Sequence, residues 1–258
     1  MKKKIISILI CLITIISCFS LNGCLRSDKY EDYFFLYEKN NDFAVIVGLT
    51  ELGKEQEVLV VPKQIEGLQI KRIGKSKSWF GYDLIASGNL EKIFVKNSTQ
   101  FIFIYDGFLN CDNLENVILM HFDVSYLENY SDSGDYRVIP PQCVINKETY
   151  DEIKLSEEAD WLRKFKIANI EFRLNYKEGK EDIFWLDNEP ADSLITKWYE
   201  GYYSPEREGY SFVGWYKESE CVNEWDFEND KTLPDILDEE TGETKKQVTR
   251  LYAKWNKN

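Results

Sequence analysis

The sequence has few of the residues that most often carry catalysis, metal binding or covalent cross-links. It contains one histidine, two methionines and six cysteines in 258 residues. Only Cys111, Cys143 and Cys221 lie beyond position 24, and their wide spacing fits neither a disulfide framework nor a zinc site, so we expect them to pack as small apolar groups. The single histidine, His121, lies between a methionine and a phenylalanine, a setting that favours a structural role.

The sequence also lacks the motifs that mark common active sites. It has no Gly-x-Ser-x-Gly elbow and no Gly-rich phosphate loop, so we predict a non-enzymatic protein without cofactor or metal. Paired acids such as Asp182 and Asp187 carry little information in a chain this acidic. The acidic stretch 235–243 lacks the spacing of a preformed calcium loop, so we expect a solvated insertion, with calcium binding left open. Its acids are Asp235, Asp238, Glu239, Glu240 and Glu243.

Positive charge is in deficit. The chain has 45 acidic and 32 basic residues, a net charge of −13, and all the acids lie after position 24. Nucleic acids and anionic membrane surfaces are bound mainly through lysine and arginine. The composition therefore argues against a nucleic-acid partner and against direct binding to an anionic membrane.

Long apolar runs are absent after the first 21 residues. Three lysines at positions 2–4, an apolar run over residues 5–21 and then small residues are typical of an export signal. Leu21-Asn22-Gly23-Cys24 resembles the lipobox of bacterial lipoproteins. The resemblance implies that the leader 1–23 is removed and that a diacylglycerol on Cys24 anchors the chain through the tether 24–32. The remainder would face the extracellular side of the cell membrane.

Two alternatives to this anchor stay open. Ile15-Ile16-Ser17-Cys18 has the same pattern, so Cys18 is a second candidate, although it leaves a shorter apolar run. An uncleaved N-terminal helix is the other alternative, because residues 5–21 are at the short end of what crosses a hydrocarbon core of about 30 Å. It would change the anchor but not the side of the membrane.

The first half of the exported part reads as strands with an internal repeat. Residues 34–37 and 43–47 flank an Asn/Asp-rich break and predict a hairpin, and residues 58–61 predict a strand that ends at a proline. Asn-Leu-Glu-Lys-Ile-Phe-Val at 89–95 recurs as Asn-Leu-Glu-Asn-Val-Ile-Leu at 113–119. A period of 24 residues is typical of leucine-rich solenoids, in which each coil is buried by its neighbours.

Residues 57–124 resemble the BspA-like leucine-rich repeat. The matching pieces are Val60-Val61-Pro62, Arg72-Ile73-Gly74 and the turn at 110–117. The resemblance implies a short, irregular solenoid of about three coils within a domain 33–166, with an extended solenoid face as the contact surface. Residues 146–154 and 156–165 predict a helical cap over its last coil, with capping residue types at both starts.

From residue 167 the aromatic content rises. Residues 170–176 alternate strictly and predict a strand with one buried face, and residues 183–186 begin its return. The pattern Pro-x-Arg-x-Gly-Tyr-x-Phe-x-Gly-Trp-Tyr at 205–216, then Trp-Asp-Phe at 225–227 and Leu-Tyr-Ala-Lys-Trp at 251–255, resembles the internalin-type B-repeat. The resemblance covers residues 168–255 and implies a small β-grasp-like domain over 167–258 with a core of aromatic rings.

The sequence therefore predicts a mainly β protein with short helices: a leucine-rich-repeat solenoid followed by a β-grasp-like domain. Both resemblances imply a cell-surface lipoprotein that recognises an extracellular protein or glycan. Tyr199, Tyr202 and Tyr203 are candidate contact residues, with a role in the domain's own core as the alternative. The rival functions are a structural envelope spacer and a glycan-acting or solute-binding lipoprotein.

Overall fold

The computed structural model describes residues 29–31, 33–77, 81–83, 85–96, 102–103, 111–123, 143–156, 165–195, 205–239, 242 and 244–258. This part of the chain is mainly β, as predicted, with a few short helices. None of its helices has the length and hydropathy needed to cross a membrane.

The first sheet is built around the predicted hairpin. Strands β2 (Phe35–Asn40) and β3 (Phe43–Leu49) pair antiparallel, and the sheet order is β1-β2-β3-β6-β10, with β5 paired to β6. Strands β3, β6 and β10 run parallel to one another. The remaining strands are β1 (Lys29–Glu31), β5 (Gln64–Ile65), β6 (Leu68–Ile73) and β10 (Ile102–Phe103).

Two small elements extend from this sheet. Helix α2 (Glu51–Lys54) follows β3, and the side chain of its N-cap residue Thr50 accepts a hydrogen bond from the Gly53 N–H. Strands β7 (Lys75–Lys77) and β8 (Gly81–Asp83) form a separate antiparallel hairpin.

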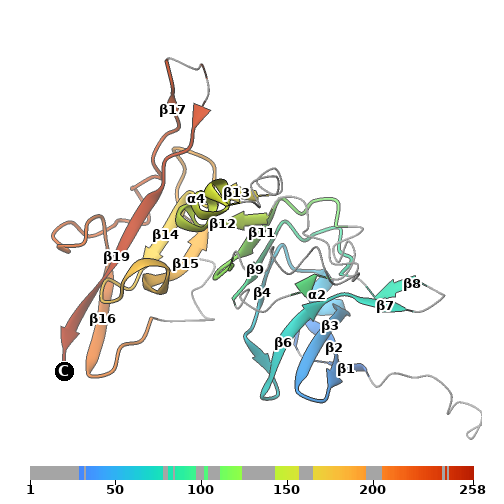
Figure 1. Cartoon of the computed structure of the whole chain (residues 1–258). Coiled ribbons are helices and arrows are strands. Elements are labelled where there is room, and N and C mark those ends of the chain that lie inside the picture. The colour runs from blue at the N-terminus through green and yellow to red at the C-terminus, as the bar shows by residue number, and fades with distance from the viewer. Residues whose placement is uncertain are drawn as a thin grey trace, which may run out of the picture.

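The second sheet contains five parallel strands in chain order (Figure 1). They are β4 (Val58–Val61), β9 (Lys92–Val95), β11 (Asn116–Leu119), β12 (Cys143–Ile145) and β13 (Phe165–Ile167). Lys92 pairs with Asn116 and Val95 pairs with Leu119. This register has the same offset of 24 residues as the sequence repeat, so the two copies are neighbouring strands. From β3 to β11 the chain alternates between the first and second sheets.

Both faces of the second sheet are buried. One face packs on the first sheet and forms a first core, to which β4, β9 and β11 contribute Leu59, Val61, Ile93, Val95, Val117 and Leu119. The other face forms a second core with the C-terminal part of the chain, to which the same sheet contributes Val60, Phe94, Ile118, Met120 and Val144. Strands buried on both sides read as continuous apolar runs, which explains the sequence of β4.

The third sheet is mixed and has the order β15-β14-β19-β16. Its central strands β14 and β19 run parallel, and both outer pairs are antiparallel. The strands are β14 (Ile170–Arg173), β15 (Ile183–Asp187), β16 (Tyr210–Tyr216) and β19 (Thr249–Lys257). The four predicted strand positions are confirmed.

Aromatic rings form the core beneath this sheet. The Trp215 ring lies 4.9 Å from the Phe172 ring and 5.2 Å from the Phe212 ring, between centroids. The pairing of β16 with β19 shifts between Phe212 and Gly214, a bulge of the kind that glycine permits. A Cβ at Gly214 would lie 3.2 Å from the Glu224 carboxylate.

One prediction about β14 is wrong. The strict alternation of residues 170–176 predicted one buried and one solvated face, but Glu171 is fully buried together with Ile170 and Phe172. The Glu171 carboxylate accepts hydrogen bonds from Arg173 at 2.7 Å and Arg250 at 3.0 Å. Burial of a charge with cationic partners keeps the alternating pattern in the sequence while removing the solvated face.

Helix α4 (Lys147–Leu155) is the predicted cap. The Asn146 side chain accepts a hydrogen bond from the Thr149 N–H at 2.8 Å, as a helix N-cap does. The second predicted helix, 156–165, falls mostly outside the described residues, and its last residue belongs to strand β13 instead. Ion pairs join α4 to the third sheet and to the turn η2 (Gly179–Asp182) that follows β14.

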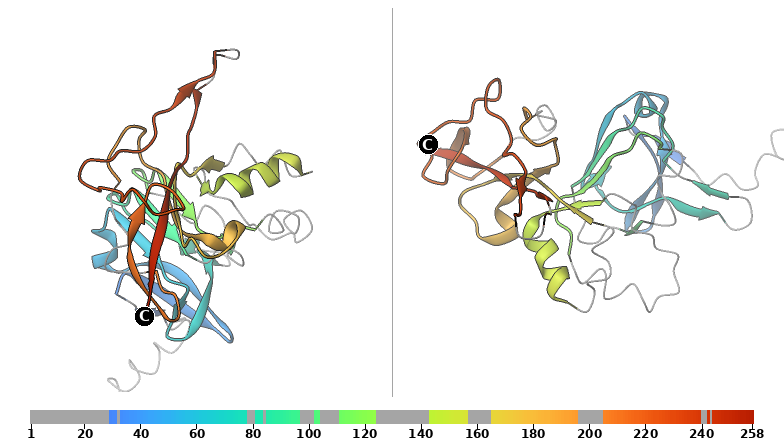
Figure 2. Two further views of the ribbon diagram at one scale, coloured as in Figure 1. Left: turned by 90° about the vertical axis from the view of Figure 1, so that its left-hand side faces the viewer. Right: turned by 90° about the horizontal axis from the view of Figure 1, so that it is seen from above.

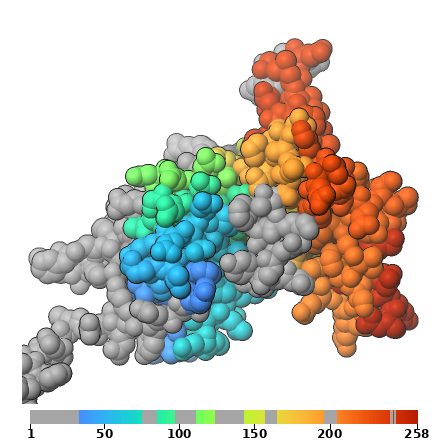
Figure 3. All heavy atoms as spheres, turned by 180° about the vertical axis from the view of Figure 1, so that it is seen from behind, coloured from blue at the N-terminus to red at the C-terminus, as the bar shows by residue number. Residues whose placement is uncertain are grey.

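The acidic insertion forms a hairpin that projects from the body (Figures 1 and 3). Strands β17 (Ile236–Leu237) and β18 (Thr244–Lys245) pair antiparallel, and Lys245 forms an ion pair with Asp238. Glu240 and Glu243 lie outside the described residues. Within the described ranges no group of three or more acids, cysteines or histidines could hold a metal ion.

The arrangement corrects the expected contact surface. We expected an extended solenoid face to be open for a partner. For the second sheet this expectation is wrong, because its described strands lie between the first sheet and the third (Figure 2). The sheets are joined in one body, and any site on the repeat region must lie at an edge of the second sheet.

Candidate functional site

The candidate site lies at the junction where the second and third sheets meet. Apolar contact there includes the rings of Phe94 and Trp185, whose centroids are 4.7 Å apart. Lys92 of β9 reaches across the junction, where its Nζ lies 2.7 Å from Asp187 Oδ1 and 2.9 Å from Glu189 Oε1. These contacts fix the third sheet against the second and set the position of the loops beside them.

The charges of this ion pair are strongly buried. The exposed fraction is 9% for the Lys92 side chain and 1% for that of Asp187. Burial raises the pKa of the Asp187 carboxyl to about 6, against the opposing effect of Lys92. Burial also opposes the charge on Lys92, but the two carboxylates outweigh it and raise the lysine pKa. Both groups are therefore charged at neutral pH.

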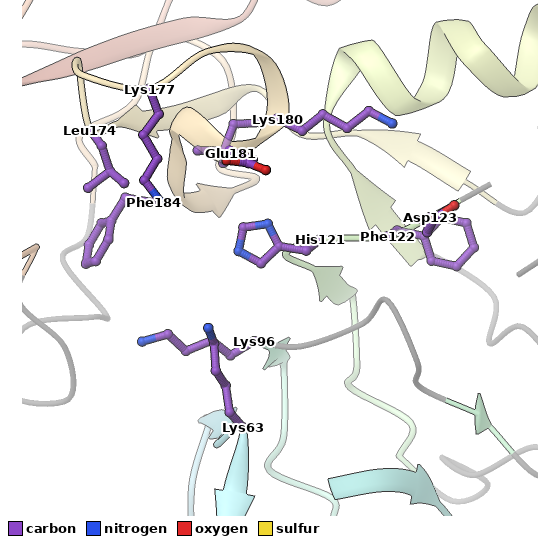
Figure 4. A pocket seen from close by; sticks show the side chains of 11 residues that line it. Lys63, Lys96, His121, Phe122, Asp123, Leu174, Lys177, Lys180, Glu181 and Phe184 are labelled. Carbon is purple, nitrogen blue, oxygen red and sulfur yellow. The ribbon is translucent and has the colours of Figure 1, made fainter. Parts of the chain in front are cut away.

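A cavity of about 590 Å³ opens between the two sheets beside this ion pair (Figure 4). The second sheet supplies residues from the segments that follow β4, β9 and β11. The third sheet supplies residues from β15 and from the segment between β14 and β15. The lining residues are Lys63, Lys96, His121, Phe122, Asp123, Leu174, Lys177, Lys180, Glu181, Ile183 and Phe184.

The parallel register explains why basic side chains gather on one wall. Val61 pairs with Val95, and Val95 pairs with Leu119. Lys63, Lys96 and His121 follow these paired residues by one or two positions, so all three lie at the carboxyl edge of the sheet. This edge is where parallel sheets commonly place ligand-binding residues.

The positive charges of the cavity lower one another's pKa values. Burial, with Lys63 adding to it and Glu206 opposing it, lowers the pKa of Lys96 to about 7. Burial and the nearby Lys63, Lys96 and Lys177 lower the pKa of His121 to about 4. At neutral pH His121 is therefore neutral, and Lys96 is close to half-protonated.

The opposite wall combines apolar and charged groups. Leu174, Ile183 and Phe184 supply apolar surface, and Phe184 is half-buried. Lys180 forms an ion pair with Glu152 of α4, and the second acid on the wall is Glu181. A cavity with clustered cations, a few acceptors and an apolar wall can bind a compact anion that also carries apolar surface.

The sequence-based candidates do not lie in this cavity. The possible lipid sites Cys24 and Cys18, and the candidate contacts Tyr199, Tyr202 and Tyr203, fall outside the described residues. His121 lines the cavity wall instead of packing in a core, which corrects our interpretation of it. The missed signal is a lysine or histidine within two positions of the end of each repeated strand, a spacing that any parallel stack turns into a cluster.

Comparison with known proteins supports one part of the sequence interpretation. Residues 188–237 match the Listeria-Bacteroides repeat domain. The Listeria-Bacteroides repeat starts directly after β15, includes β16 and lies within the predicted B-repeat at 168–255. It fits a surface-associated bacterial protein. No curated protein and no solved structure matches the chain, and the leucine-rich-repeat resemblance stays a prediction.

Proposed function

We propose that this protein is a non-enzymatic lipoprotein of the cell surface that recognises an extracellular ligand. The diacylated cysteine would be Cys24, and everything after it would face outward. The Listeria-Bacteroides repeat supports a surface association, and the N-terminal lysines, apolar run and lipobox-like residues support the anchor.

We also propose family folds for the two parts of the body. Five parallel strands in chain order, with a 24-residue register, support a short leucine-rich solenoid. The strand order β15-β14-β19-β16 with a parallel central pair supports a β-grasp-like domain. In this proposal the second domain covers the solenoid sheet, so recognition takes place at the seam between them.

The observation that carries recognition is the junction cavity. Its lining contains four lysines and two carboxylates in a chain where acids outnumber bases. An uneven distribution of this kind is costly, because clustered like charges repel one another. A ligand that neutralises the cluster would offset the cost.

A structural spacer is the second candidate function. The core shared by the second and third sheets favours it, since a rigid body transmits the distance between anchor and surface. A spacer has no need of a lysine-lined cavity, however. A hydrolase acting through paired carboxylates finds less support, because cations predominate around this cavity.

Two experiments test the proposal. Labelling cells with radioactive palmitate, for the wild type and for Cys24→Ala and Cys18→Ala, is expected to show label lost only with Cys24→Ala. Label that survives this change would refute Cys24 as the anchor. Screening the Cys24→Ala protein against mucin, matrix proteins and glycans is expected to give specific binding, whereas failure across a broad panel would favour the spacer.

A further inference from the structure

The junction cavity suggests which chemical class of ligand the protein takes. The inference starts from the distribution of charge. Elsewhere in the described chain, lysines lie against carboxylates, as Lys39 does with Glu66, Lys147 with Asp151 and Lys217 with Asp230. At the cavity, Lys63, Lys96 and Lys177 lie near one another and near His121.

The protein holds these cations together at a measurable cost. Burial and neighbouring positive charge lower the pKa values of both Lys96 and His121, to about 7 and about 4. A lysine with a pKa this low is partly deprived of its charge by its surroundings. Strongly perturbed groups that share a cavity mark candidate binding sites, because a ligand of opposite charge relieves the perturbation.

The other groups of the lining narrow the ligand further. Asp123 and Glu181 would repel a dense polyanion, but their carboxylates accept hydrogen bonds from hydroxyl groups. Phe184 and Leu174 offer apolar surface on the wall opposite Lys63 and Lys96 (Figure 4). The cavity volume of about 590 Å³ is in the range of small-molecule sites.

We propose that the junction cavity binds a sugar ring that carries a carboxylate or a sulfate ester. The anionic group lies against Lys63 and Lys96, the hydroxyls donate to the acids, and the apolar ring face packs on Phe184. This inference rests on the proposed function of ligand recognition and specifies the ligand class of that site.

Binding is expected to depend on pH. The titratable groups that face Lys96 and His121 are Lys63, Lys177, Lys180, Asp123, Glu181 and Glu206. A bound anion favours the charged form of Lys96, so binding takes up a proton. Affinity therefore falls as pH rises above about 7, where Lys96 loses its charge.

The single histidine of the chain provides the readout. The ¹³C-histidine NMR signal of the full chain in detergent is titrated with pH, in the presence of glucuronate, glucose 6-sulfate, glucose or inorganic sulfate. Each acidic sugar is expected to raise the pKa of His121 by about 0.5 or more, since it adds a negative charge beside the ring. Glucose is expected to leave the pKa unchanged, and inorganic sulfate to bind more weakly than glucose 6-sulfate.

Variants assign the effect to the cavity. Lys96→Met and Lys63→Met are each expected to weaken binding of the acidic sugars by about tenfold, the usual effect of losing one charged hydrogen bond. Lys246→Met removes an exposed lysine outside the cavity and is expected to change nothing. Thermal unfolding of each variant shows that it is folded, and two cavity variants keep the test valid if one misfolds.

Several results would overturn the inference. They are the absence of a shift with either acidic sugar, an equal shift with glucose, sulfate as effective as the sugars, or full binding by both cavity variants. Failure of the wider function gives different results. Extracellular partners that bind Lys96→Met with unchanged affinity would leave recognition intact and remove this site. Chemical conversion of a bound sugar would keep the site and refute a non-enzymatic role.

Discussion

At the residue scale, the junction depends on charges that are buried and paired. Lys92 lies between two carboxylates, and Asn188 donates a hydrogen bond to Asn116 at 3.0 Å across the same seam. Removing one partner of such a pair leaves a buried charge without compensation, which costs far more than the loss of a surface ion pair. The junction and the cavity beside it are therefore sensitive to single side chains.

Lys92→Met is expected to lower the free energy of unfolding by about 3 to 5 kcal/mol, because it leaves the buried Asp187 carboxylate unneutralised. Urea unfolding measures the change. Lys54→Met is the control: it removes an exposed pair with Glu51 and is expected to cost less than about 1 kcal/mol. Adding Asp187→Asn to Lys92→Met is expected to restore part of the loss. Equal costs for the two lysine variants would contradict the assignment.

His121 is expected to titrate with a pKa of about 4 in the folded protein and near 6.5 in urea. The chain has one histidine, so its NMR signal is unambiguous. Lys96→Met is expected to raise the folded-state pKa, because it removes one of the cations that lower it. A folded-state pKa near 6.5 would place His121 outside the basic cavity.

The same shift predicts how stability depends on pH. Because the folded-state pKa of His121 lies below its ordinary value, the unfolded chain binds the proton first as pH falls. The contribution of His121 therefore lowers stability as pH falls from about 6.5 to about 4 and is constant below that. His121→Gln is expected to gain stability relative to the wild type across this window. A difference that does not vary with pH would contradict the sign.

At the element scale, the structure explains a glycine in a helix. A Cβ on Gly53 of α2 would lie 2.2 Å from the Phe34 carbonyl oxygen. Gly53→Ala is therefore expected to cost about 1 to 3 kcal/mol, as overpacking against backbone does. Gly88→Ala, where nothing lies within 4 Å of the added Cβ, is expected to be neutral or slightly stabilising. Thermal unfolding that ranks the two variants the other way would contradict the packing of α2 on the hairpin.

The sequence predicted elements where one local rule decided the structure. The break at residues 40–42 gave the hairpin, and Asn146 gave the helix cap. The 24-residue repeat gave the register of β9 and β11, because stacked coils align equivalent residues. Glu171 shows the limit: its pattern is that of a solvated face, and only Arg173 and Arg250 explain its burial.

At the scale of the whole molecule, the sequence could not predict the cavity. Its residues come from positions 63 to 184 and from two sheets, and no local pattern states which face of one sheet covers another. The sequence suggested two modules in series. In the structure they share a core that includes Phe94, Ile118, Phe172 and Trp185, and the candidate site exists because of this contact.

The most direct test of the account is whether the sheets unfold together. Tryptophan fluorescence follows the C-terminal part through Trp185 and Trp215, and pulsed thiol labelling of Cys143 follows the first core. In a urea titration of the full protein, the shared core predicts that both signals change with the same midpoint and slope. A fluorescence transition that is complete while Cys143 is still protected would show two independent modules and would contradict a site built at their junction.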